Sequence, residues 1–282
     1  MELCKVRITF FVAVSTFVGF ILHSGNISLQ IILPSLGVFI LASGSSALNE
    51  YQEREADKLM SRTKSRPIPS GRINEKSALL LSLTLLIAGL ATIFFSSNLN
   101  ALLLGVLAVI WYNAIYTPLK KKYVMAVVPG SLIGAIPPII GWAASGGNPF
   151  DFEILTVALF FFIWQIPHFW LLLLIFSEDY ESAGFPTLTQ KFSKYQLSRI
   201  TFIWITALVT SCLLIPVFSV SSNVYSLMAM IVLGIWLLWK TKFILNDILE
   251  KFVFRKAFVS INLYVLAIIV ILSIDKLLLQ EI

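Results

Sequence analysis

Apolar residues follow one another along this chain in nine long runs that are separated by shorter polar stretches. The runs cover residues 8–25, 29–49, 77–96, 99–117, 124–143, 154–175, 200–219, 223–240 and 257–275. Each is close to the roughly 20 residues that an α-helix needs to cross the apolar core of a bilayer. A helix satisfies its own backbone hydrogen bonds, so it is the element that such runs form in lipid. The pattern predicts an all-α membrane protein with nine transmembrane helices in a single domain, residues 1–282.

The composition agrees with this interpretation. Hydrophobic residues make up 58% of the 282 positions and charged residues only 13%, whereas about a quarter of a soluble domain is charged. The runs are too many and too evenly spaced for a signal peptide in front of a soluble domain. The two cysteines, Cys4 and Cys212, have neither metal-binding spacing nor a disulfide framework, so we expect structural roles for them.

Basic residues lie almost entirely in alternate connections between the runs. All but one of the 21 lysines and arginines precede the first run or follow an even-numbered run, and only Lys276 follows the last. Positive charge is retained on the cytoplasmic side of a membrane. The pattern predicts that the amino terminus and the active-site loops lie in the cytoplasm and that the carboxyl terminus lies outside. The membrane we expect is the cell inner membrane. The net charge of +6 therefore reports orientation, and no nucleic-acid partner is expected.

The densest charged stretch of the chain follows the second run. Within it, Asn49, Glu53 and Asp57 recur at intervals of four residues, which places them on one face of a helix. Oxygen ligands in this arrangement suit Mg²⁺, which takes a few carboxylates together with phosphate oxygens. Arg62 and Arg66 follow directly, and cations beside a metal site indicate a phosphorylated ligand. A solvated loop of mixed charge is the alternative interpretation.

A second acidic segment, with Glu178 and Asp179, follows the sixth run. Two acidic sites at one membrane face suggest two metal ions that clamp a diphosphate. When an allylic diphosphate ionises, fixed cations stabilise the charge that grows on the leaving group. An apolar bundle interior would hold the isoprenoid tail and keep water away from the carbocation. The basic side chains that would hold the diphosphate lie in connections at the same face: Arg62, Arg66, Lys120 and Lys121.

Two further side chains are candidates for substrate binding. His168 lies inside the sixth run, and a polar residue within a span is by default a functional candidate. The alternative is a histidine that hydrogen-bonds a neighbouring helix. Tyr116 precedes the lysine cluster by one helical turn and could bond a phosphate oxygen, although tyrosines also gather at membrane interfaces without further function.

Four segments of the chain carry residue patterns that are specific in combination. They are Asn49-x3-Glu53-x3-Asp57-x2-Met60-x-Arg62-Thr63-x2-Arg66-Pro67, then Tyr116-Thr117-Pro118-Leu119-Lys120-Lys121 with Pro137-Pro138 after it, then Trp164-Gln165-x-Pro167-His168-Phe169-Trp170, and finally Asp179-Tyr180-x2-Ala183-Gly184-x-Pro186. Together they resemble the motifs of the UbiA-type intramembrane prenyltransferases, over most of the chain. The last pattern resembles that of the heme prenyltransferases within the family rather than that of the quinone prenyltransferases.

This resemblance implies a fold, a reaction and partners. The expected fold is nine helices around a central cavity, with Mg²⁺ as cofactor and with farnesyl diphosphate and heme b as substrates. Farnesyl transfer to a heme vinyl group, with water completing a hydroxyethylfarnesyl side chain, would give heme O and diphosphate. Because heme O serves terminal oxidase assembly, a heme A synthase or oxidase assembly factors are further partners that it implies, besides the lipid bilayer.

The same resemblance implies roles for individual residues. The expected catalytic residues are Asn49, Glu53, Asp57 and Asp179. The expected metal ligands are Asn49, Glu53, Asp57, Glu178 and Asp179. The expected substrate-binding residues are Arg62, Arg66, Tyr116, Lys120, Lys121, His168 and Tyr180.

The chain departs from the family pattern at two positions. Glu53 stands where an aspartate is usual, and its extra methylene moves the carboxylate while keeping an oxygen ligand for Mg²⁺. Ala183 stands where many members carry an acid, which leaves either Glu178 or Glu181 to complete the second acidic site.

Two other functions are weighed against heme farnesylation. A prenyltransferase that acts on a quinone precursor or another aromatic acceptor would have the same fold, but His168 and the pattern after Asp179 argue against it. A transporter or channel predicts charged residues near the middle of the membrane. Here the charges gather at one face, and the runs contain almost no charged side chain.

Overall fold

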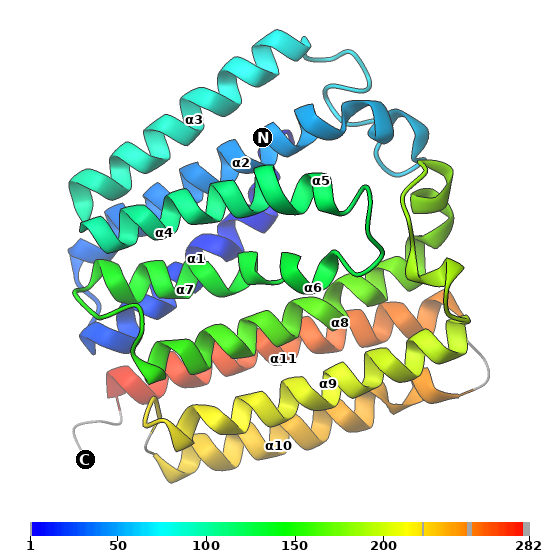
Figure 1. Ribbon diagram of the computed structural model, residues 1–282. Helices are drawn as coiled ribbons and strands as arrows, with labels where there is room; N and C mark the ends of the chain where they lie inside the picture. Colours follow the sequence, from blue (N-terminus) through cyan, green and yellow to red (C-terminus); the bar gives the residue numbers. More distant parts are fainter. Residues whose placement is uncertain (1, 222, 247–249, 279–282) are drawn as a thin grey trace.

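The computed structural model describes residues 2–221, 223–246 and 250–278. Within them every regular element is a helix, and the long helices lie side by side (Figure 1). In chain order the elements are α1 (Val6–Ser24), η1 (Leu29–Ile31), α2 (Ile32–Leu59), α3 (Glu75–Ser96), α4 (Leu99–Val109), η2 (Ile110–Tyr116), α5 (Thr117–Leu119), α6 (Val127–Gly130), α7 (Leu132–Ala144), α8 (Phe152–Ser182), η3 (Leu188–Gln190), α9 (Lys194–Val217), α10 (Val224–Thr241), η4 (Lys242–Leu245) and α11 (Lys251–Leu278). Of the η elements, η2 is a π-helix and the others are 3₁₀-helices.

Nine helical segments among the described residues are long and apolar enough to cross a membrane, which confirms the predicted multi-pass, all-α fold. Several of them extend beyond the predicted runs, and two of these extensions bear on the candidate site. The second continues to Leu59 instead of residue 49, and the sixth continues to Ser182 instead of residue 175. Hydropathy marks where the apolar run ends, whereas Glu, Gln, Arg, Lys and Ala are good helix formers that continue the helix. Both acidic segments therefore lie on the ends of membrane helices and not in loops.

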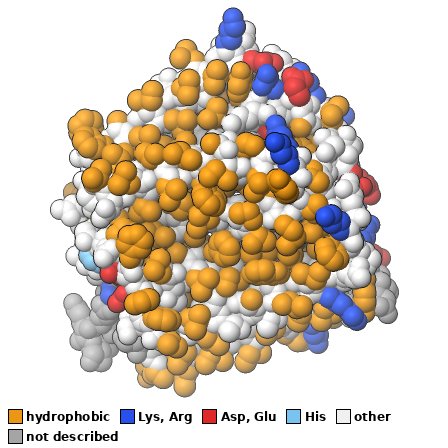
Figure 2. Space-filling model, viewed as in Figure 1, with side chains coloured by type: hydrophobic (Ala, Val, Ile, Leu, Met, Phe, Trp, Pro, Cys, Tyr) orange, Lys and Arg blue, Asp and Glu red, His pale blue; other side chains and the backbone are white. Residues whose placement is uncertain are grey.

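The helices form two groups that share a core. In one group α1, α2, α3, α4 and α7 pack against one another, and in the other α8 packs with α9 and α11 while α10 completes the layer. The contacts of α7 with α8 and of α1 with α11 join the two groups. The longer connections gather at one end of the bundle, on the right in Figure 1. Hydrophobic side chains cover the middle of the visible surface, and charged ones lie toward its edges (Figure 2).

The contact between α1 and α7 brings two backbones close together. A Cβ on Gly141 would lie 1.8 Å from the carbonyl oxygen of Thr16, and one on Gly19 would lie 2.0 Å from that of Pro138. Small residues allow such an approach between membrane helices, where van der Waals packing drives association. The contact fixes the position of α1, whose N-cap residue, Lys5, reaches the candidate site.

Candidate functional site

The candidate site is built around the acidic face of α2, which we define as Asn49, Glu53 and Asp57. All three side chains lie on α2 and are buried, with exposed fractions of 1%, 6% and 2%. Buried charges require partners because removing them from water is costly. This burial argues against the alternative of a solvated loop of mixed charge.

Both carboxylates of the acidic face of α2 are matched by cations from other segments. Lys120 Nζ lies 2.7 Å from Glu53 Oε1, and Arg66 Nη1 donates to Asp57 Oδ2 at 2.7 Å. Burial acts to lower the pKa of Lys120, but the charge and hydrogen bond of Glu53, together with Tyr116 and Tyr112, outweigh it and the net pKa is raised. Burial also acts to lower the pKa of Arg66, but Asp57, with Glu50 and Glu53, outweighs it and the net pKa is raised. Both cations therefore stay charged.

Asn49 is held in one orientation by a chain of hydrogen bonds. The Thr117 hydroxyl donates to the carbonyl oxygen of Tyr112 at 2.8 Å, so it can only accept from Asn49 Nδ2, which lies 3.1 Å away. The amide oxygen of Asn49 is thereby turned toward Lys5, whose Nζ donates to it at 3.2 Å. Lys5 adopts a left-handed backbone conformation with φ 47°, and burial lowers its pKa to about 8. The arrangement presents an oriented amide oxygen beside half-buried cations.

The π-helix η2 carries Asn113 into contact with α2. The Ser45 hydroxyl donates to Asn113 Oδ1, Asn113 Nδ2 donates to the carbonyl of Ser45 at 3.0 Å, and Gln52 Nε2 donates to the carbonyl of Asn113 at 3.0 Å. The backbone N–H of Thr117, after η2, bonds the carbonyl of Tyr112 five residues back. Short π-helical insertions are frequent at functional sites, and this one fixes η2 against the acidic face of α2.

Tyr116 and Lys121 lie on the same side of the site. Tyr116 is buried against Gly130, where an added Cβ would lie 2.4 Å from the ring, and Lys120 Nζ lies 5.3 Å from the ring centroid. Lys121 Nζ donates to the backbone carbonyl of Gln52 at 3.0 Å. The structure therefore brings Tyr116, Lys120 and Lys121 together beside α2.

The second acidic segment, the acidic end of α8 (Glu178, Asp179 and Glu181), is tied to the end of α2. The helix is kinked at Phe176, with φ −123° and ψ 24°. Asp179 Oδ1 accepts from the backbone N–H of Ser61 at 3.2 Å and from its hydroxyl. Arg62 Nη2 donates to the Tyr180 hydroxyl at 3.5 Å. The two acidic segments, far apart in sequence, thus meet at one end of the bundle.

A cavity of about 330 Å³ opens where the two segments meet. Its lining residues are Ser61, Arg62, Ile175, Phe176, Glu178, Asp179 and Lys251. Glu178 Oε2 lies 3.4 Å from Lys251 Nζ. Glu181 does not line this cavity and instead accepts hydrogen bonds from Thr187 and Thr189 at 3.2 and 2.7 Å. Glu178, and not Glu181, therefore lines the same cavity as Asp179.

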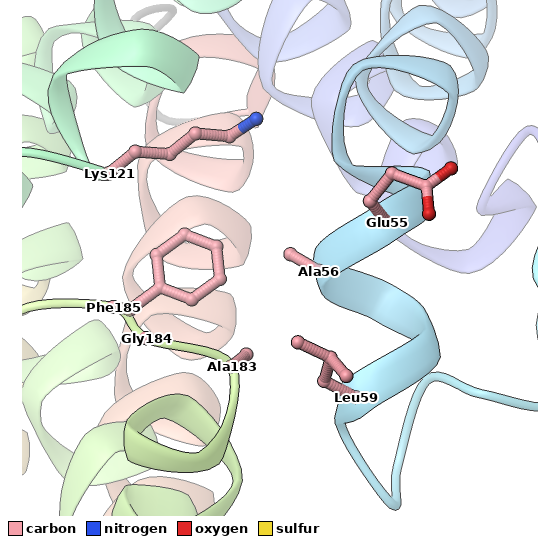
Figure 3. A pocket seen from close by; sticks show the side chains of 7 residues that line it. All are labelled: Glu55, Ala56, Leu59, Lys121, Ala183, Gly184 and Phe185. Carbon is pink, nitrogen blue, oxygen red and sulfur yellow. The ribbon is translucent and has the colours of Figure 1, made fainter.

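A second cavity, of about 290 Å³, lies between α2 and the segment after α8 (Figure 3). On one side Ala56 and Leu59 project from α2, and on the other lies Phe185. Lys121 reaches across from the segment after α5, with its amino group directed toward α2 (Figure 3). Both cavities therefore lie at the same end of the bundle as the acidic segments.

His168 lies apart from the charged residues, on α8 within the bundle. Its Nδ1 is 3.0 Å from Asn262 Oδ1 on α11. Aromatic rings surround the imidazole, with centroids of Trp164 at 5.0 Å, Phe169 at 5.5 Å and Phe258 at 4.7 Å. A hydrogen bond to a neighbouring helix, which was the alternative interpretation of His168, is therefore present.

The donor set at the acidic face of α2 fits Mg²⁺ that is shared with a substrate. Among the described residues no three Asp, Glu, His or Cys side chains converge as a metal cluster. The oxygens available are those of Asn49, Glu53 and Asp57, and Glu50 Oε2 is buried without a hydrogen-bond partner in the described part of the chain. Hard oxygen donors that leave positions open are what Mg²⁺ takes when phosphate oxygens complete its coordination.

The sequence analysis did not single out three residues that the structure places in the site. Lys5 contributes to the predicted charge asymmetry without being singled out as a site residue. Thr117 lies inside a quoted motif, yet its bond to Asn49 joins residues 68 positions apart. Glu50 directly follows Asn49, and its burial could have been suspected from its place one turn before Glu53 and Arg54.

Comparison with known proteins gives the family of this chain. The UbiA prenyltransferase family model matches residues 12–262. The chain is similar to the curated Protoheme IX farnesyltransferase of Nitratidesulfovibrio vulgaris (strain DP4), at 33% identity over 98% of this chain and 94% of that one. It is also similar to the Protoheme IX farnesyltransferase of Legionella pneumophila (strain Paris), at 32% identity over 98% and 94%.

Solved structures agree with the fold. The structure reported for digeranylgeranylglyceryl phosphate synthase superposes with a TM-score of 0.78 at 19% identity, covering 98% of this chain and 96% of that one. A UbiA homologue from Archaeoglobus fulgidus, bound to DMAPP and Mg²⁺, superposes with a TM-score of 0.61 at 17% identity, covering 97% and 98%. The nine membrane helices, the family match and these neighbours lead to one conclusion: the chain is a multi-pass membrane enzyme that belongs to the UbiA prenyltransferase family.

Proposed function

We propose that this protein transfers the farnesyl group of farnesyl diphosphate to a vinyl group of heme b, giving heme O and diphosphate. The observation that carries the proposal is the buried acidic face of α2 with its cations from three other segments. It occurs in a chain whose relatives with the name Protoheme IX farnesyltransferase align over nearly the whole length. A buried cluster of this kind suits a diphosphate that arrives with its own metal ion.

The donor end of the site would bind and ionise farnesyl diphosphate. Asn49, Glu53 and Asp57 would hold Mg²⁺, with Glu178 and Asp179 at the second acidic segment. Bound Mg²⁺ supplies positive charge that stabilises the departing diphosphate. The basic residues that would neutralise the same oxygens are Arg62, Arg66, Lys120 and Lys121, with Tyr116 donating a hydrogen bond. Because these cations are already fixed by partners, little reorganisation is needed as charge develops.

The acceptor end would lie deeper in the bundle, near His168. The C–O bond of farnesyl diphosphate breaks, and the terminal vinyl carbon of the porphyrin forms a new bond with farnesyl C1. Water then adds to the other vinyl carbon and loses a proton, which completes the hydroxyethylfarnesyl side chain. The aromatic residues around His168 provide a dry surface for a flat macrocycle, and such a surface excludes water from a carbocation until capture.

The location and partners follow from the charge pattern and the reaction. We place the protein in the cell inner membrane with the amino terminus and the acidic segments on the cytoplasmic side, because all but one of its basic residues fall in alternate connections. A heme A synthase or terminal oxidase assembly factors are the partners that would receive heme O.

The decisive experiment incubates membranes containing the protein with heme b, farnesyl diphosphate and Mg²⁺, and reads the mass of the extracted heme. A farnesylated, hydrated heme that requires the metal is expected. Asp57→Asn should abolish most of this product, whereas Glu75→Gln, an exposed acid on α3 that lines neither cavity, should leave it unchanged. Prenylation of 4-hydroxybenzoate without any heme product would overturn the choice of acceptor while keeping the family.

A further inference from the structure

The hydrogen-bond geometry around Asn262 determines which ring nitrogen of His168 carries a proton. Asn262 Nδ2 donates to the carbonyl oxygen of Phe258 at 2.6 Å, one turn back on α11. A backbone carbonyl can only accept, so the amide must place its nitrogen there and its oxygen toward His168. Asn262 Oδ1 can only accept as well, so the 3.0 Å contact requires a proton on Nδ1 of His168. The neutral imidazole then keeps its lone pair on Nε2.

The surroundings of His168 leave Nε2 available. Among the described residues Nε2 forms no hydrogen bond. It is also not fully buried, so a ligand can reach it. The ring is flanked by Trp164 and Phe258 rather than by acidic groups. The indole N–H of Trp164, one turn before His168, is buried and has no acceptor within the described residues. A lone pair among aromatic rings suits a flat macrocycle with a metal at its centre.

We propose that Asn262 is a positioning residue that holds His168 as the Nδ1–H tautomer, so that Nε2 ligates the iron of the heme acceptor. Metal-ligating histidines generally donate their other ring N–H to a fixed acceptor, which sets the ring orientation and the tautomer. The inference rests on the proposed function, because it takes heme as the acceptor. It goes further than that function because it assigns His168 as the iron ligand and Asn262 as the residue that fixes its tautomer and ring orientation.

The position of His168 along α8 is consistent with this role. Eight residues separate His168 from Phe176, which is about 12 Å along a helix. Phe176 lies beside Arg62, whose guanidinium carbon is 5.2 Å from its ring centroid. A porphyrin with its iron at His168 therefore lies deeper in the bundle than the charged end. Its edge can extend toward the place where farnesyl C1 leaves the diphosphate.

The test uses the purified full-length protein in detergent, titrated with hemin, the ferric form of heme b, without farnesyl diphosphate. Absorption spectra report ligation by the shift of the Soret band. In the wild type we expect a shifted band, and in His168→Ala its loss, with recovery when free imidazole is added. Asn262→Leu should bind hemin roughly tenfold more weakly, in line with the loss of a residue that orients a metal ligand. Asn262→Asp keeps the acceptor oxygen and should retain most of the affinity.

Ser273→Ala provides the matched control. Ser273 also donates to the carbonyl four residues back on α11, and its side chain forms no other hydrogen bond among the described residues, so its loss should leave the spectrum and the affinity unchanged. Thermal unfolding shows whether each variant is folded. If Asn262→Leu is not folded, the recovery of the Soret shift by imidazole in His168→Ala still tests the iron ligand.

Three outcomes would overturn the inference. A wild-type Soret band in His168→Ala would show that His168 is not the iron ligand. Unchanged hemin affinity in Asn262→Leu would show that Asn262 is not its positioning residue. In either case, heme O formation by the wild type would leave the proposed function intact. Failure of the wild type both to bind hemin and to farnesylate heme would reject the proposed function itself, and this inference with it.

Discussion

The acidic face of α2 and the acidic end of α8 meet at one end of the bundle, but they differ in burial. Glu53 and Asp57 have exposed side-chain fractions of 8% and 3%, and each has a close cation. Glu178 is 79% exposed, and its partner Lys251 is 55% exposed. Buried pairs are costly to break, while exposed pairs contribute little. The first segment is therefore part of the folded core, whereas the second is free to respond to a ligand.

Removing one cation from each segment should give the largest difference in stability between them. Lys120→Met leaves Glu53 buried without its partner and should destabilise the protein by about 3–5 kcal/mol. Lys251→Met removes an exposed partner and should change stability by less than about 1 kcal/mol. Thermal unfolding in detergent measures both. Equal losses of stability in the two variants would contradict the difference between the segments.

The next largest effect is expected on turnover. Asp57→Asn removes a buried carboxylate that we assign to the metal and leaves Arg66 with only Glu50, 3.7 Å away, as a charged partner. Farnesyl transfer should therefore fall roughly a hundredfold, the size of losing one preorganised electrostatic contact. Product mass from membranes at limiting Mg²⁺ measures the rate. Glu75→Gln, on the exposed surface of α3 and outside both cavities, serves as control, and near-normal turnover in Asp57→Asn would reject its assignment.

A smaller effect is expected from the hydroxyl that orients Asn49. Thr117→Val keeps the shape of the side chain but removes the acceptor for Asn49 Nδ2. The Mg²⁺ concentration for half-maximal activity should rise roughly tenfold, as for other residues that orient metal ligands, while Thr117→Ser should stay near the wild type. Binding of Mn²⁺ followed by electron paramagnetic resonance gives a second readout. An unchanged metal requirement in the valine variant would show that Asn49 needs no such support.

The smallest effect is expected on the KM for farnesyl diphosphate, and it distinguishes two acids at the acidic end of α8. Glu178 shares a cavity with Asp179, whereas Glu181 is bonded to Thr187 and Thr189. Glu178→Gln should therefore raise the KM for farnesyl diphosphate severalfold, and Glu181→Gln should leave it near the wild-type value, since exposed single charges contribute modestly. Steady-state kinetics at saturating heme distinguish the two. The reverse pattern would assign the second site to Glu181.

Local patterns in the sequence predicted the membrane helices and the acidic face of α2. Apolar runs report spans directly, and a four-residue interval reports a shared helix face, because both depend on neighbours in sequence. The same reasoning underestimated α2 and α8, since hydropathy falls at Glu50 and after Phe176 although the helices continue to Leu59 and Ser182.

Contacts between segments far apart in the sequence could not be predicted from local patterns. The pairs Lys5–Asn49, Ser61–Asp179 and His168–Asn262 join residues 44, 118 and 94 positions apart, and no local spacing encodes them. The π-helix at η2 was equally hidden, because its sequence has the apolar character of an ordinary span. Roles for the predicted metal ligands and substrate-binding residues stay predictions until the variants above are measured.

The pairing of Glu53 with Lys120 has a consequence for how the protein is made. A ribosome produces Glu53 well before Lys120, because α3, α4 and η2 lie between them in the chain. Arg66, by contrast, follows Asp57 by only nine residues. During biosynthesis the nascent chain therefore carries one acid whose partner is nearby and one whose partner has not yet been translated. Completion of the amino-terminal half of the site must wait for the fourth membrane span to be inserted.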